Sequence, residues 1–271
     1  KLQMQVIGLC RFSYPAIGGF QVEHETLEDR IAFLYAEDRL EERFRFFECF
    51  TLPSLRGQLD DDFTFLIMIG DSLPVHHRQR LEALVEDIPQ VVIQAHPPRK
   101  HREMMKEAIN SVRRFDGEHS LQFRLDDDDA IGIGFIARLR EAGGNLIGFA
   151  ADHRSVAIDF NTGFIAQPSA KGIAVEEIQR QYWTSSLGVM IQPSSKISVM
   201  NFGHNNIWQW MPTVTFTGED MVLRGHNDYN DSRQGKNVSK VRLTPLDKDG
   251  ELRMKMSYNI DADHVRRVFR R

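Results

Sequence analysis

The sequence predicts an α/β protein with a Rossmann-type, mostly parallel central sheet flanked by helices, and an irregular, β-rich C-terminal portion. Short apolar runs alternate with amphipathic helical patterns along the first half of the chain. These runs are apolar throughout, as is typical of parallel strands that are buried on both faces. In the second half the pattern changes to alternating strand-like segments separated by turn residues.

The strands and helices of the first half follow from these patterns. The runs expected to form strands are residues 6–10, 63–69, 91–93 and 121–125. Between the first two runs, Leu40, Phe44 and Phe47 recur at spacings of four and three, which predicts a helix over residues 37–50. Further helices are expected after Pro74 and over residues 101–115.

The second half predicts two hairpins and one short helix. The first hairpin pairs residues 156–160 with 164–166 around Asn161-Thr162-Gly163. The second pairs residues 241–243 with 252–256 around residues 247–250. Residues 146–149 are strand-like, and a helix is expected to begin near Asp263.

Composition excludes several classes of protein. The 271 residues carry 34 Lys+Arg against 38 Asp+Glu, a net charge of −4, which argues against a nucleic-acid binder. Only Cys10 and Cys49 are present, so no disulfide framework is expected and a reducing compartment fits. Residues 1–10 hold too short an apolar patch for a signal peptide, and no run approaches the roughly 20 residues that span a bilayer. We expect one cytoplasmic domain over residues 1–271.

Four consecutive aspartates, Asp126 to Asp129, follow the strand that ends near Leu125. Neither strand nor helix propensity favours four adjacent carboxylates, which repel one another. At the carboxyl end of a strand they would project into the crevice where open α/β sheets bind ligands. A hard cation such as Mg²⁺ or Mn²⁺ would offset the repulsion, and alternation places Asp126 and Asp128 on one side. The alternative is a solvated turn in which an aspartate caps a helix beginning near Ala130.

Residues 124–130, Arg-Leu-Asp-Asp-Asp-Asp-Ala, look like the extended DxD signature of nucleotide-sugar glycosyltransferases with the GT-A fold. More narrowly, the chain resembles the bacterial family labelled putative rhamnosyl transferases. The supporting segments are Arg11-Phe12-Ser13, residues 47–55 with Gln58, and residues 224–228. The resemblance implies a GT-A-like fold, with a nucleotide-binding half over residues 1–130 and an acceptor-binding half over residues 131–271.

The resemblance also implies a metal site. Asp126 and Asp128 would hold Mn²⁺ or Mg²⁺ against the nucleotide diphosphate, and a histidine late in the fold often completes such a site. We favour His226 over His204, because Gly225 would let the backbone approach a ligand closely. A surface-loop histidine is the alternative for His226, and a polar helix cap for His204.

Other residues are candidates for binding the nucleotide sugar. Arg11 follows the first strand and could hold a phosphate or stack on a base, or simply pair with an acidic neighbour. Arg124, Asp126 and Asp127 complete this set, with Arg124 also neutralising part of the acidic run.

An inverting transfer needs a carboxylate to take the acceptor's proton. The candidates are Asp220, which we favour, and Asp152; a helix or turn start is the alternative for Asp220. The aromatic pairs Tyr182-Trp183 and Trp208/Trp210 would stack on sugars or belong to the core. Arginines at positions 266, 267, 270 and 271 form a basic end that could approach anionic lipid, or a solvated tail.

These residues predict a metal-dependent glycosyltransferase that moves a sugar from a nucleotide-sugar donor to a saccharide or lipid-linked saccharide, in bacterial surface polysaccharide synthesis. The alternatives are a metal-dependent phosphoester hydrolase and a non-catalytic carbohydrate-binding protein. A two-metal hydrolase would draw carboxylates and histidines from several strand ends. Here the early strands end in Arg11, Gly70-Asp71 and His96, which favours the transferase.

Overall fold

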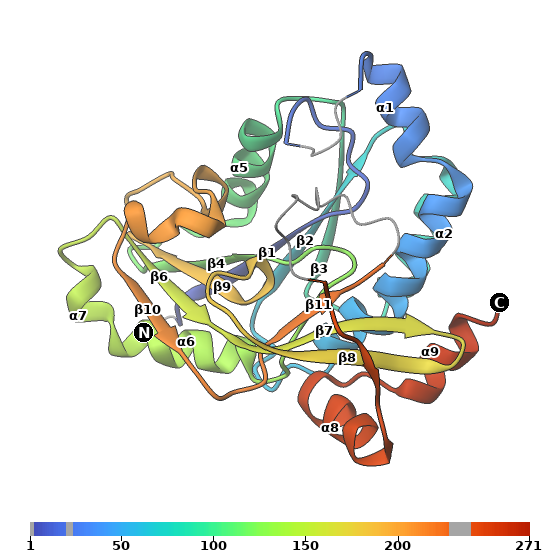
Figure 1. Cartoon of the computed structure of the whole chain (residues 1–271). Helices are drawn as coiled ribbons and strands as arrows, with labels where there is room; N and C mark the ends of the chain where they lie inside the picture. Colours follow the sequence, from blue (N-terminus) through green and yellow to red (C-terminus); the bar gives the residue numbers. More distant parts are fainter. Residues whose placement is uncertain (1–2, 20–23, 228–239) are drawn as a thin grey trace.

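A computed structural model describes residues 3–19, 24–227 and 240–271. The described chain contains a seven-stranded sheet with the order β10-β6-β9-β4-β1-β2-β3 (Figure 1). Only β9 runs antiparallel to its neighbours in this sheet. The strands are β1 (Gln5–Arg11), β2 (Thr64–Gly70), β3 (Val91–His96), β4 (Ser120–Arg124), β6 (Ser155–Phe160), β9 (Leu187–Ile191) and β10 (Thr213–Phe216). The predicted α/β class and mostly parallel sheet are confirmed.

Helices cover both faces of this sheet and bury two apolar layers. On one face, α2, α4 and α6 pack through residues such as Phe44, Leu81 and Leu139. On the other face, α5 and the 3₁₀ segments η3 and η4 pack through residues such as Met105 and Met200. The helices are α1 (Leu27–Leu34), α2 (Glu37–Phe46), α4 (Val75–Val85), α5 (His101–Val112), α6 (Phe135–Asn145) and α7 (Ile147–Ala150), with η3 (Val199–Asn201) and η4 (His204–Gln209). A π-helical turn, η1 (Phe47–Thr51), joins α2 to α3 (Leu52–Arg56).

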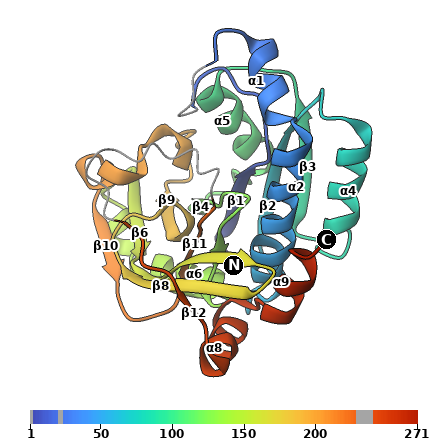
Figure 2. The same cartoon turned by 45° about the vertical axis from the view of Figure 1, so that its right-hand side comes forward.

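A second, five-stranded sheet has the order β12-β8-β7-β11-β5. Its strands are β5 (Ala130–Ile131), β7 (Thr162–Ser169), β8 (Gly172–Gln179), β11 (Val222–Gly225) and β12 (Thr244–Pro245). The helices α8 (Lys248–Tyr258) and α9 (Ala262–Val268) pack against it through Met254, Tyr258 and Val265. Figure 2 shows α9 beside the lower end of α2, where Phe46 contacts Phe269 edge to face. The second sheet therefore closes against the helices of the first half.

The prediction of a hairpin over residues 156–166 was wrong. Strand β6 belongs to the central sheet, whereas β7 belongs to the second sheet and pairs with β8. The chain passes from one sheet to the other at Asn161 instead of reversing. Gly163 serves a close approach, because a Cβ there would lie 1.8 Å from the Val222 carbonyl oxygen.

Three other local predictions were also wrong. Residues 247–250 begin helix α8, because the Asp247 side chain accepts a hydrogen bond from the Gly250 N–H (2.7 Å) as an N-cap. Residues 146–149 lie largely in α7, with Ile147 and Phe149 exposed, so their apolar character does not mark a buried strand. The expected helix near Ala130 is the short strand β5, and α6 begins only at Phe135.

The helix expected near Asp263 is α9, with Asp261 as its N-cap. Across the described ranges, no helix has the length and apolar character to cross a bilayer.

Candidate active site

The acidic loop, Asp126 to Asp129, lies between β4 and β5 at the carboxyl edge of the central sheet. Asp126 is exposed, whereas Asp127, Asp128 and Asp129 are buried. The carboxylates of Asp126, Asp128 and Asp129 each offer an oxygen, and these atoms lie within 4.8 Å of one another. Three convergent carboxylate oxygens suit a hard divalent cation.

Buried carboxylates at such short separation are electrostatically unfavourable. Burial, together with the negative charges of Asp128 and Asp126, raises the pKa of Asp127 to about 6. Burial also raises the pKa values of Asp128 and Asp129. Arg43 on α2 offsets part of this repulsion, since its Nη1 lies 3.1 Å from an Asp127 oxygen and 2.9 Å from an Asp128 oxygen. The first half of the chain thus supplies a buried cation to the acidic loop.

Strand β11 brings a segment about a hundred residues later against the same loop. The Gly225 N–H donates to Asp129 Oδ1 (3.0 Å), and the Asn227 side-chain amide lies 3.4 Å from Asp128 Oδ2. A Cβ at Gly225 would lie 2.0 Å from the Asp128 carbonyl oxygen, so only glycine permits this contact. The Asp129 carboxylate thus binds β11, and no helix begins near Ala130 for it to cap. Gly225 was expected to let the backbone approach a ligand, but it permits the close contact between β11 and the acidic loop.

A group of basic side chains lies beside Asp126. Arg11 and Arg124 are the last residues of the adjacent parallel strands β1 and β4, and both are half-buried. Burial, followed by the positive charges of Arg11, Arg124 and Arg102, lowers the pKa of His101 to about 3. These cations, at the end of the sheet where α/β folds bind ligands, form a wall suited to phosphate oxygens.

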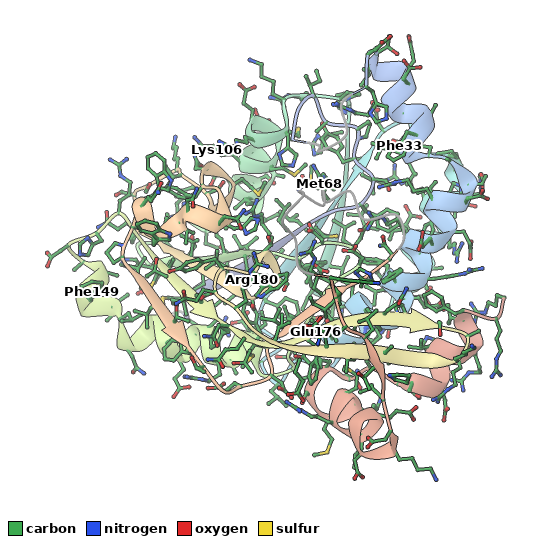
Figure 3. The ribbon with its side chains drawn as sticks, in the orientation of Figure 1. Phe33, Met68, Lys106, Phe149, Glu176 and Arg180 are labelled. Carbon is green, nitrogen blue, oxygen red and sulfur yellow. The ribbon has the colours of Figure 1, made fainter. Side chains whose placement is uncertain are left out.

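A pocket of about 300 Å³ opens beside the acidic loop. Asp126 and Asp129 line it together with Arg224 of β11, His204 of η4, and the segment that follows β8. That segment contributes Arg180, Gln181, Tyr182, Trp183, Thr184 and Ser185. Figure 3 places Arg180 near the centre of the molecule, at the end of the strand that carries Glu176. The guanidinium groups of Arg180 and Arg224 lie 5.3 and 5.2 Å from the centroid of the Trp183 ring.

Tyr182 holds this pocket wall in an unfavourable backbone conformation. Its φ of 64° lies in the left-handed region, which non-glycine residues rarely adopt. The Tyr182 N–H donates to Asp159 Oδ1 (3.1 Å), and its carbonyl oxygen lies 2.9 Å from His204 Nδ1. Burial raises the pKa of Asp159 to about 6, in spite of bonds from Tyr182 and Thr215 that favour its ionised form. Asp159 and His204 therefore fix the wall from both sides.

The sequence matches the family described as "Putative rhamnosyl transferase" over residues 5–238. The chain belongs to this family. No curated protein matches the sequence significantly.

Several solved structures resemble this family member weakly. S. aureus TarS 1–349 has 9% identity and a TM-score of 0.41, over 82% of this chain and 60% of that one. The same fragment in complex with UDP-GlcNAc gives 10% identity and a TM-score of 0.40, over 98% and 70%. A protein from Desulfovibrio desulfuricans G20, described as a "putative nucleotide-diphospho-sugar transferase", gives 10% identity and a TM-score of 0.36, over 84% of this chain and 83% of that one. This chain spans only 60% of the length of the first structure. The family to which the chain belongs is shown by the match over residues 5–238.

Not all predicted site residues meet in this family member. Asp126, Asp128 and Asp129 converge, with Arg124 and Arg11 nearby. His226 instead lines a separate pocket of about 540 Å³ with α2 residues, whereas His204 shares the pocket of Asp126. His226 directly follows β11, the strand that contacts the acidic loop. Among the described residues, neither histidine belongs to the group of ligand atoms that lie within 4.8 Å of one another. The choice of His226 as the late histidine stays a prediction.

The two carboxylates predicted as bases lie elsewhere. Asp220 accepts two hydrogen bonds from Arg253 (2.9 and 2.8 Å) and one from Ser257 (2.9 Å), which tie α8 to the second sheet. Asp152 precedes β6, at the amino edge of the central sheet, opposite the acidic loop. The structure brings neither carboxylate to the pocket, so their catalytic roles remain predictions without geometric support. Asp228, part of the motif noted above, lies outside the described residues.

Sequence reasoning missed three contributors to the site. Arg43 lies between Leu40 and Phe44, so a charged residue on the apolar face of its helix was the available signal. Asp159 stands between Ile158 and Phe160 in a strand-like segment, and a carboxylate within such a segment was a similar signal. Arg180 gave no signal, because only the pairing of β8 with β7 in the second sheet brings it to the pocket.

Gly225→Ala should destabilise the fold by about 2 kcal/mol or more, because its Cβ would overlap the Asp128 carbonyl. Gly144→Ala is the matched control, since an added Cβ there meets nothing within 4 Å and alanine favours a helix by about 1 kcal/mol at most. Urea unfolding of both variants measures the difference. Equal stability of the two variants would contradict the close approach of β11.

Asp159→Asn should change the pH dependence of stability. An acid whose pKa is raised by folding stabilises the fold below its unfolded value near 4, and this contribution disappears as the pH rises through about 6. The variant lacks this titration, so its free energy of unfolding relative to wild type should rise by about 2 kcal/mol between pH 4 and pH 7. Urea unfolding at both pH values checks the prediction, and a constant difference would refute it.

Proposed function

We propose that this chain is a metal-dependent glycosyltransferase that transfers a sugar from a nucleotide-sugar donor to a saccharide or lipid-linked saccharide acceptor. The observation that carries the proposal is the convergence of three carboxylates beside a wall of arginines at the carboxyl edge of the sheet. Family membership supports the same activity. The acidic loop and the basic wall together suit a cation and a diphosphate bound side by side.

The residues present fit a divalent metal ion. Asp126, Asp128 and Asp129 offer oxygen ligands only, which Mn²⁺ and Mg²⁺ prefer. The burial of Asp128 and Asp129 leaves a repulsion that a cation would relieve. When bound, the ion would supply positive charge against the diphosphate leaving group. Arg11 and Arg124 would hold phosphate oxygens of the donor, with residues 1–130 as the donor half of the molecule and residues 131–271 as the acceptor half.

The hydrolase alternative fits the site less well. A two-metal centre needs a second set of anionic or neutral ligands close to the first. Here Arg11 and Arg124 occupy the ends of the neighbouring strands, and these cations would repel a second metal ion. The same arginines would attract an anionic leaving group, which supports transfer from a nucleotide diphosphate.

We also propose a role in bacterial surface polysaccharide synthesis in the cytoplasm, with at most peripheral contact with the inner membrane. The basic C-terminal end is only partly available for lipid. Arg266 pairs with Glu251 and Asp263, and Arg271 approaches Glu48. Arg267 and Arg270 remain exposed. Contact with anionic lipid would therefore depend on these two arginines.

Asp126→Asn should lower the Mn²⁺-dependent affinity for a nucleoside diphosphate at least tenfold and abolish transfer. Asp126 is the clearer test, because Asp128→Asn, which should also abolish transfer, removes an oxygen that binds the buried Arg43. Calorimetric titration with UDP, GDP and dTDP, with Mn²⁺ or with chelator, measures the effect. Asp249→Asn, an exposed position in α8, is the matched control.

Wild-type protein should also gain thermal stability from Mn²⁺ and the nucleotide together. Equal nucleotide affinity in excess chelator would contradict the metal-dependent mechanism. Unchanged Mn²⁺-dependent binding by Asp126→Asn would contradict the assignment of this residue.

Alanine substitutions of the two late histidines should separate their roles. If His226 completes the metal site, His226→Ala weakens Mn²⁺-dependent nucleotide binding and His204→Ala does not. The shared pocket of His204 and Asp126 favours the opposite result, which would transfer the role to His204. Calorimetric titration of both variants decides, and normal binding by both would refute a histidine ligand.

A further inference from the structure

We propose that the acceptor carries an anionic group, a phosphate or a sugar carboxylate, and that Arg180 binds this group beside the ring of Trp183. This inference rests on the proposed function and names the chemical class of its second substrate. The subsite belongs to the pocket of about 300 Å³ that Asp126 and Asp129 also line. An anion bound there would lie next to the reacting centre.

Arg180 lines this pocket, and no carboxylate among the described residues forms an ion pair with it. The side chain is exposed, and within the described ranges its recorded side-chain contact is with the Trp183 ring, with no ion-pair partner. Arg224, by contrast, lowers the pKa values of Asp128 and Asp129 and so serves the acidic loop. Arg253 of α8, which packs against the second sheet, pairs with Asp220 and Glu177. An unneutralised guanidinium at a pocket wall is available for a ligand anion.

The segment that carries Arg180 is held rigidly. The Arg180 N–H donates to the Asn161 carbonyl (2.8 Å), and the Ser186 hydroxyl donates to the Phe160 carbonyl (2.9 Å). Between these points, Asp159 and His204 fix the left-handed Tyr182. The backbone of this wall is therefore fixed before binding, which lowers the entropy cost of ordering the segment around a ligand.

The charge balance favours the acceptor as the anion. An acidic loop repels any anionic substrate that approaches it, so a charged acceptor needs a cation on its own side of the pocket. The donor diphosphate already has Arg11 and Arg124 at the ends of β1 and β4. Arg180 follows β8 of the second sheet, in the half assigned to the acceptor. A neutral acceptor would require no such residue.

The buried Trp183 Nε1–H adds unused hydrogen-bonding capacity at this wall. Among the described residues it has no acceptor, and its ring lies under the Arg180 guanidinium. Tyr182 and Trp183 also offer aromatic faces to a sugar ring in the same pocket.

The test compares sugars that differ in charge. The protein of residues 1–271 is saturated with Mn²⁺ and the nucleoside diphosphate that binds most tightly, and glucose, glucuronate and glucose 6-phosphate are then titrated calorimetrically. We expect at least one charged sugar to bind tenfold or more tightly than glucose. Arg180→Ala should remove that advantage and leave the nucleotide affinity unchanged. Arg270→Ala is the matched control, because Arg270 is exposed and lies outside the pocket.

Each outcome bears on the inference. Preference for glucuronate identifies the anion as a carboxylate, and preference for glucose 6-phosphate identifies a phosphate. Equal binding of the three sugars, or an undiminished preference in Arg180→Ala, overturns the inference while the donor site stands. A loss of nucleotide affinity in Arg180→Ala assigns the residue to the donor and also overturns it. Failure of every nucleoside diphosphate to bind the wild type removes the proposed function itself, and the inference with it.

Discussion

Mutual repulsion among the four carboxylates that follow β4 is the constraint on which the other features of the site depend. Three of them are buried, so the chain must bring positive charge and hydrogen-bond donors to them. Arg43 comes from α2, and the Gly225 N–H comes from β11, almost a hundred residues later. The remaining demand for positive charge explains why this loop is suited to a divalent cation. Burying such a loop lowers the stability of the fold. We propose that it is buried because it forms a ligand site.

The same constraint organises the second sheet. Strand β11 must lie against the acidic loop, and Gly225 permits that approach because any side chain would meet the Asp128 carbonyl. The short strand β5, which follows the loop directly, pairs with β11 and fixes its register. The segment after β8 then faces the loop across the pocket, where Asp159 keeps Tyr182 in its left-handed conformation. One face of the pocket is therefore acidic, and the others carry arginines.

Local patterns allowed the central sheet to be predicted, whereas the second sheet depends on contacts that no local pattern records. Buried strands such as β1 and β2 are continuous apolar runs, and Leu40, Phe44 and Phe47 mark α2 and its continuation. The residues around Gly163 and Gly250 looked like hairpin turns, yet one glycine permits contact with Val222 and the other follows a helix cap. The acidic loop was recognisable because its charge conflicts with its place in a strand pattern. Arg180 was not, since its place at the pocket arises from tertiary packing, and Arg43 gave only the weaker signal of a charge on the apolar face of its helix.

The central claim is that the acidic loop binds a divalent cation in contact with a nucleotide diphosphate. Electron paramagnetic resonance of Mn²⁺ tests it most directly, because bound Mn²⁺ loses the signal of the free ion and couples to nearby phosphorus nuclei. The account predicts one Mn²⁺ bound per chain, with a phosphorus coupling that appears when a nucleoside diphosphate is added. Mn²⁺ that stays free in solution, or that binds without coupling to the diphosphate, would contradict it.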